Sequence, residues 1–150
     1  MSSGASVIAD VLAGWEGDVH LEREVFATIE PEAIAAAVDD FCRSHLDAGV
    51  SRYEFFATSV GSVHGVRLGD GRRVVIKAYR ADVESDHLLA VQRVQAQLSA
   101  ARFPSPRPIL GPTSLAHGCR SSAARRHIVG PGAAFALQIV GLAVAEPERL

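Results

Sequence analysis

The amino-acid sequence predicts an α+β fold: an antiparallel sheet of at least three strands with one packed helix, preceded by N-terminal helices and followed by an irregular C-terminal tail. Three observations lead to this prediction. Apolar residues recur at helical spacing over residues 31–48, residues 52–79 are rich in β-branched and aromatic side chains, and helical spacing returns over residues 84–101. With 150 residues the chain is long enough to bury a core of its own.

The N-terminal segment, residues 1–49, is expected to be helical. Residues 5–14 predict a short helix that Gly14 ends, whereas residues 18–26 fit a helix and a strand equally well. A longer helix is expected over residues 31–48, because proline suits a first helical turn and a glycine, Gly49, follows the last periodic residue. Its apolar stripe consists of Ile34, Val38, Phe41, Cys42 and Leu46.

Three strands are expected next, over residues 52–60, 63–68 and 72–79, joined as an antiparallel meander. The Asp-Gly pair within residues 68–71 is typical of a tight hairpin, because both residue types accept a positive φ. Alternation along the third strand gives it two faces, one with Val74, Ile76 and Ala78, the other with Val75, Lys77 and Tyr79.

After the helix over residues 84–101, the stretch "FPSPRPILGP" predicts an extended connector with an edge strand at residues 108–110. From residue 116 the composition changes: the tail has no Asp and no Lys and little periodicity until a short apolar run. The sequence therefore divides into residues 1–49, 50–115 and 116–150. Three interpretations of the last segment stay open: a disordered tail, the product of a frame-shifted reading frame, or a native tail that covers part of the sheet.

Composition and charge exclude several classes of partner. The formal net charge is −2 and the isoelectric point is about 6.3, so we expect neither a nucleic-acid nor a membrane partner. No stretch has the length of a membrane span, and the N-terminus does not resemble a signal peptide. Cys42 and Cys119 lack metal-ligand spacing and are expected to be buried free thiols, which favours a cytoplasmic location.

Lys77 is the only lysine in the chain, and every other basic side chain is Arg or His. Lysine is a compact charge on a flexible stem and suits phosphate oxygens, while the glycines before it let backbone N–H groups come close to a phosphate. Ser59 and Ser62 could donate hydrogen bonds from the same loop, whereas His64 is expected to be an exposed loop residue. The alternative for Lys77 is a solvated residue on the open face of a sheet.

The stretches "SVGSVHGVRL", "VVIKAY" and "FPSPRPILGP" together resemble the N-terminal lobe of the aminoglycoside phosphotransferase and choline kinase superfamily, which shares the protein-kinase fold. The resemblance covers residues 50–115. It implies that Lys77 is the phosphate-binding lysine of the third strand, that Val75 packs on adenine, and that ATP is the cofactor. The loop over residues 60–66 would supply the remaining nucleotide contacts, Gly61, Ser62, Val63 and Gly65.

The sequence departs from that family in its catalytic residues. A kinase needs a catalytic Asp and an Asn and an Asp that hold Mg²⁺, but this chain has no Asn and no Asp after Asp86. The helix after Lys77 offers Gln92 and Gln95 where the family has a glutamate. We therefore expect no catalytic and no metal-ligating residue here, and Mg²⁺ only if a partner supplies a catalytic lobe.

Two functions follow from these observations. The first is a nucleotide-binding lobe of a small-molecule kinase, incompetent by itself or completed by a separate catalytic-lobe chain. The second is a non-enzymatic remnant or interaction module without nucleotide binding.

Other candidate residues are expected to have no functional role. The six histidines lack metal-ligand spacing, and Asp39 and Asp40 are expected on a solvated helix face. The basic cluster of residues 120–127 is expected to be a solvated tail.

Overall fold

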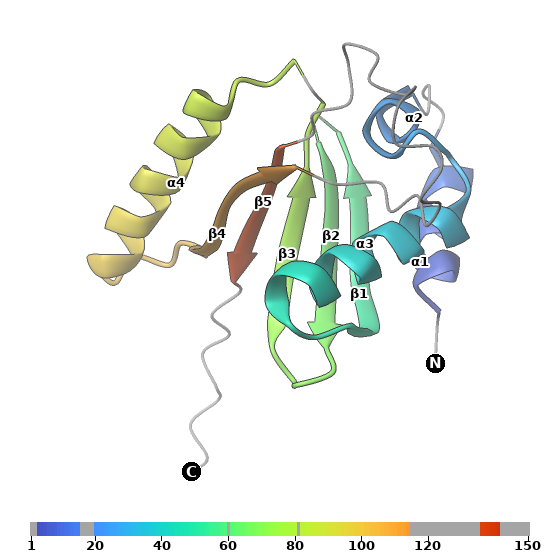
Figure 1. Cartoon of the computed structure of the whole chain (residues 1–150), viewed down its shortest axis with the longest axis horizontal. Helices are drawn as coiled ribbons and strands as arrows, with labels where there is room; N and C mark the ends of the chain where they lie inside the picture. Colours follow the sequence, from blue (N-terminus) through green and yellow to red (C-terminus); the bar gives the residue numbers. More distant parts are fainter. Residues whose placement is uncertain (1–2, 16–19, 60, 81, 115–135, 142–150) are drawn as a thin grey trace, which may run out of the picture.

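The computed structural model describes residues 3–15, 20–59, 61–80, 82–114 and 136–141. Within these residues it is an α+β fold, as predicted, with helices on both sides of a five-stranded antiparallel sheet in the order β1-β2-β3-β5-β4 (Figure 1). The elements are α1 (Gly4–Ala13), α2 (His20–Phe26), α3 (Pro31–Leu46), β1 (Val50–Thr58), β2 (Ser62–Leu68), β3 (Arg73–Ala78), α4 (Ser85–Ala100), β4 (Arg107–Ser114) and β5 (Ala136–Gly141).

The three N-terminal helices follow local sequence signals. The side chain of Ser3 caps α1 by accepting a hydrogen bond from Ser6 N, and Gly14 ends the helix as predicted. The ambiguous residues 18–26 contain a helix, α2. Helix α3 begins at a proline but ends earlier than expected, because Asp47 rather than Gly49 takes the left-handed conformation, with φ of 57°.

The predicted meander is present as β1, β2 and β3. At the tight turn between β2 and β3, Gly71 has φ of 89°, and its N–H donates to the carbonyl oxygen of Leu68 over 3.0 Å. The pairing of β1 with β2 is irregular between Tyr53 and Phe55. At this irregularity two consecutive residues of β1 project to the same face of the sheet instead of to opposite faces.

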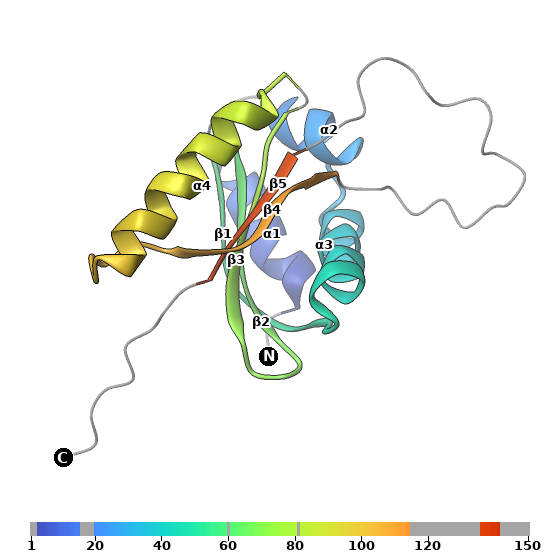
Figure 2. The ribbon, with the colours of Figure 1, turned by 60° about the vertical axis from the view of Figure 1, so that its left-hand side comes forward.

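Helices α1, α2 and α3 pack on one face of the meander and form the core with it. The face of β3 that was predicted to be apolar is buried there. Helix α4 lies on the other side of the sheet, against β4 and β5, as the two views show (Figures 1 and 2). The buried core consists of Ile8, Val25, Phe26, Ile34, Val38, Phe41, Cys42, Leu46, Tyr53, Phe56, Val66, Leu68, Val74, Ile76 and Ala78.

The second half of the sheet corrects the sequence-based expectation for the tail. The edge strand expected at residues 108–110 extends over Arg107–Ser114 as β4, but its partner β5 comes from the segment that was expected to be irregular. Strand β5 pairs with both β3 and β4, so it occupies an interior position. The other residues of the 116–150 segment lie outside the described part of the chain. None of the helices described has the length and hydrophobicity needed to cross a membrane.

Candidate functional site

Four of the six residues predicted to bind nucleotide lie together on the sheet face opposite the α1–α3 core. In the register of β2 and β3, Val63 is opposite Lys77 and Gly65 is opposite Val75. Because cross-strand partners project to the same side of a sheet, these two pairs form neighbouring rows on one surface. The structure therefore brings the lone lysine next to apolar and glycine positions of the adjacent strand.

The side chain of Lys77 is half-buried, and no ion pair or hydrogen bond joins its ammonium group to a residue of the ranges 3–15, 20–59, 61–80 and 82–114; its register partner on β5 is Gln138. Gln92 of α4, one of the two glutamines considered as its neighbour, is buried and donates from Nε2 to the carbonyl oxygen of Leu110 over 2.8 Å. That amide therefore ties α4 to β4.

The two remaining predicted site residues have other contacts. Gly61 packs against β3, where an added Cβ would lie 3.2 Å from the carbonyl oxygen of Ala78 and 3.4 Å from the ring of Tyr79. Ser62 is fully buried on the core side, with its Oγ hydrogen-bonded to Nε2 of His64 over 2.9 Å. Ser59, the other hydroxyl proposed for phosphate binding, is exposed, and residue 60 of the predicted loop lies outside the described residues.

His64 is not the exposed loop residue that the sequence predicted. It is fully buried on the core face of β2, with ring centroids of Phe26 and Phe56 at 5.5 and 5.0 Å. Its Nδ1 lies 3.4 Å from the hydroxyl oxygen of Tyr53. Burial lowers the pKa of His64 to about 3, so the imidazole is neutral at physiological pH. The prediction was wrong because it assigned His64 to the glycine loop of residues 60–66, although the strand predicted over residues 63–68 also contains it; in β2 its side chain lies on the buried face.

A further side chain on the open face was missed by the sequence reasoning. Phe55 of β1 is opposite Gly65 and has 41% of its surface exposed. Its ring lies over Gly65, where a Cβ would overlap the ring atoms. The row Phe55–Gly65–Val75 thus crosses three strands beside the row that contains Lys77.

Charged residues occupy the same face beyond Phe55, toward the β2–β3 hairpin. Glu54 forms salt bridges with Arg67 and Arg73, with N–O distances of 3.2 and 2.7 Å. The hydrogen bonds from Arg73 and then Arg67 hold the pKa of Glu54 below its usual value. These two arginines are therefore already paired with a carboxylate, in contrast to Lys77.

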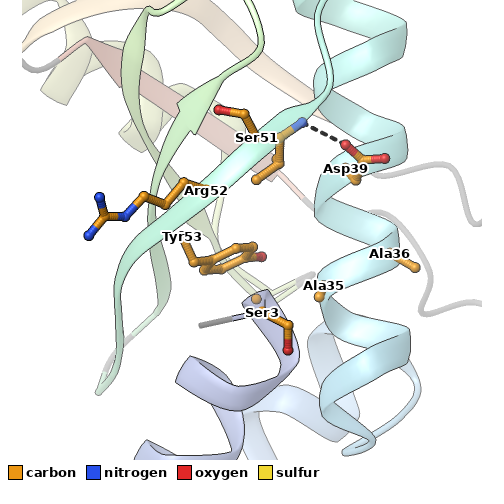
Figure 3. A pocket seen from close by; sticks show the side chains of 9 residues that line it. Ser3, Ala35, Ala36, Asp39, Ser51, Arg52 and Tyr53 are labelled. Carbon is orange, nitrogen blue, oxygen red and sulfur yellow. Dashed lines mark hydrogen bonds between the residues drawn. The ribbon is translucent and has the colours of Figure 1, made fainter. Parts of the chain in front are cut away.

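A separate pocket of about 280 Å³ lies between α1, α3 and β1 (Figure 3). Asp39 lines it, but its carboxylate is engaged: Oδ1 accepts from Val50 N over 2.6 Å and Oδ2 accepts from Arg43 over 2.8 Å. Asp39 is partly exposed, and beyond the expected solvated face its side chain also joins α3 to the start of β1. The pocket contains none of the predicted site residues, and it is lined by Ser3, Gly4, Ala35, Ala36, Asp39, Val50, Ser51, Arg52 and Tyr53.

Two further polar groups, those of Cys42 and Glu22, are buried. Cys42 is a free buried thiol, as predicted, and burial raises its pKa to about 12. Glu22 of α2 is buried, and its Oε1 has no hydrogen-bond partner in the described structure.

No group of three or more potential metal ligands occurs among the described residues. Cys119 and the basic cluster of residues 120–127 lie outside them.

Comparison with known proteins finds a similarity to Nodulation protein Z of Sinorhizobium fredii (strain NBRC 101917 / NGR234), with 33% identity over 107 residues. The aligned region covers 69% of this chain and 29% of that protein, so the chain spans less than a third of the relative's length. No family model matches the chain. No solved structure matches it either.

Proposed function

We propose that this chain is the nucleotide-binding N-terminal lobe of a small-molecule kinase similar to the aminoglycoside phosphotransferases, with ATP as its ligand. The observation that carries the proposal is the register of β2 and β3, in which Val63 and Lys77 lie side by side next to Gly65 and Val75 on the sheet face opposite the α1–α3 core. Lys77 has no carboxylate partner among the described residues. An ammonium group without a carboxylate partner favours an anionic ligand.

The order of elements also supports this proposal. In the kinase pattern a glycine-bearing turn joins the first two strands, the lysine lies on the third strand, and a helix follows it. The same order occurs here, with Gly61 before β2, Lys77 near the end of β3, and α4 as the next element. Val75, the residue compared with the adenine-packing position, is two residues before Lys77 and on the same face.

The proposed lobe does not transfer a phosphoryl group by itself. The chain has no Asn and no Asp beyond Asp86, and phosphoryl transfer depends on metal-assisted charge stabilisation. The described residues do not fit a magnesium site, since no cluster of ligands occurs among them. Mg²⁺ and the catalytic acid would come from a catalytic lobe, either of the same protein or of a partner chain. In the relative from Sinorhizobium fredii the similar region is 29% of a longer chain. We place the protein in the cytoplasm, where ATP is available.

Calorimetric titration of the purified chain with ATP·Mg²⁺ and with ADP tests the proposal. We expect binding that Lys77→Ala weakens about tenfold or more, the size expected for a charge-assisted hydrogen bond. Arg93→Ala, which removes one positive charge from the exposed surface of α4, is the matched control and should leave the affinity unchanged. Lys77→Arg should also weaken binding if a compact cation is required.

An interaction module without nucleotide binding is the alternative function. Large apolar side chains are exposed on α4 and after it, including Val94 at 55% and Phe103 at 59%, and exposed apolar groups of this kind are typical of contact surfaces. Absence of heat at millimolar ATP, from a sample whose circular dichroism shows the folded state, would favour this alternative and contradict the nucleotide proposal.

A further inference from the structure

Phe55 is an exposed aromatic side chain on the same sheet face as Lys77. It lies on a regular sheet face, yet 41% of its surface is open to solvent. Leaving a large aromatic surface in water forgoes the free energy that burial would give. The exposed ring therefore offers apolar area to a ligand.

Gly65 shapes the surface around this ring. The ring lies directly over Gly65, and any side chain at that position would overlap it. Val75, which follows in the same row, is buried. The row thus combines an open aromatic ring with the glycine on which it rests and an apolar neighbour, an arrangement that suits a flat apolar ring system.

The charges on this face distinguish its two ends. Toward the hairpin, Arg67 and Arg73 share the carboxylate of Glu54, which offsets part of their positive charge. In the other direction, the next row along the strands contains Lys77, roughly 7 Å away for a two-residue step. A nucleotide has the same polarity, with a flat base at one end and phosphates beyond the ribose at the other.

We propose that the purine ring of the bound nucleotide stacks on the exposed face of Phe55, with its phosphates directed toward Lys77. This inference rests on the proposed nucleotide-binding function and deepens it by assigning base recognition to a residue of β1. Lys77 then recognises the phosphates and Phe55 recognises the base. A ligand that lacks the base therefore separates their contributions to the binding affinity.

The experiment compares ATP with inorganic tripolyphosphate, which has the phosphates but no base, in titrations of the full chain. We expect Phe55→Ala to weaken ATP binding roughly five- to a hundredfold, the range for loss of one base–aromatic stack, and to leave tripolyphosphate binding unchanged. Lys77→Ala should weaken both ligands. Phe55→Trp should retain ATP binding. Phe103→Ala removes an exposed phenylalanine far from β1 in the sequence and should change neither ligand.

Several outcomes separate the inference from the function on which it rests. If wild type binds ATP and Phe55→Ala binds it equally well, stacking on Phe55 is wrong while the nucleotide proposal stands. If Phe55→Ala weakens tripolyphosphate as much as ATP, the residue has only a structural role. If wild type binds neither ligand, the proposed function itself fails. Gly65→Ala, which forces the Phe55 ring from its position, provides a second variant and should reproduce the selective loss of ATP affinity.

Discussion

Acidification should destabilise this protein through one buried side chain, His64. The imidazole is fully enclosed by Phe26, Phe56 and Tyr53, and its Nε2 is hydrogen-bonded to Ser62. In the unfolded chain the same group is solvated and has its ordinary pKa of 6.5. In the folded protein its pKa is lowered to about 3 because burial disfavours the charged form.

The sign of the effect follows from which state binds the proton. Between pH 6.5 and pH 3 the unfolded state binds a proton on His64 and the folded state does not, so the free energy of unfolding falls as the pH is lowered. The contribution of the neutral, buried His64 to the free energy of unfolding is fully present above pH 6.5. Each pH unit below that value costs about 1.4 kcal/mol, so acidification from about pH 7.5 to 5 removes about 2 kcal/mol. This is a large share of the stability of a typical domain.

Urea unfolding of wild type and His64→Gln at both pH values measures this contribution. The glutamine amide keeps hydrogen-bonding capacity but does not titrate, so the variant should lose about 2 kcal/mol less than wild type over the same interval. Other titrating groups contribute to both proteins and cancel in the difference. His87→Gln, which changes an exposed histidine of α4, should behave as wild type.

An equal loss of stability in wild type and His64→Gln would refute the reasoning. It would mean that the imidazole is accessible or already charged in the folded protein. A direct measurement on wild type gives the same information if the variant does not fold: the NMR shifts of the His64 ring should not titrate down to about pH 4.

Two further predictions concern stability and reactivity. Asp39→Ala should lower the free energy of unfolding by about 1–2 kcal/mol in urea melts, because Val50 N loses its acceptor, while Asp40→Ala at the neighbouring exposed position should change it by less than about 0.5 kcal/mol. Cys42, whose pKa is raised to about 12, should react with a disulfide reagent only after unfolding when tested in a Cys119→Ser background; rapid reaction of the folded protein would contradict its burial.

Much of the first half of the fold could be predicted because its signals are local. Pro31, the helical spacing after it and the Asp-Gly turn at Gly71 each fix an element without help from distant residues. The split of β3 into a buried face and a second face also follows from a period of two. Helix α2 stayed ambiguous because its seven residues cover only about two helical turns, too few for the spacing to decide.

The misjudged parts depend on contacts between segments that are distant in sequence. Strand β5 has little pattern of its own, and only pairing with β3 and β4 defines it. His64 and Ser62 were assigned to a glycine loop, His64 as an exposed residue and Ser62 as a phosphate donor, because of the kinase-like pattern; in the structure they are neighbours on the buried face of β2 and hydrogen-bond to each other. Phe55 was missed because the irregular pairing of β1 moves it to the open face, which strict alternation does not foresee.

For the candidate site, the sequence indicated Lys77 and Val75 through their spacing on one strand. It could not show that Val63 and Gly65 lie beside them, because that depends on the register between β2 and β3. The direction of the Gln92 side chain could not be predicted either. That side chain binds the Leu110 carbonyl oxygen instead.

The interior position of β5 has a consequence for how the protein is made. A ribosome releases β1, β2 and β3 first, and their two hairpins can close at once through short loops. Strand β4 has no partner other than β5 within the described sheet. The edge of β3 that does not pair with β2 also pairs only with β5. Until Gly141 has emerged, the nascent chain therefore presents unpaired strand edges of the kind that recruit other chains. The yield of soluble protein should thus depend on translation through this last strand and on the chaperones that shield the edges before it arrives.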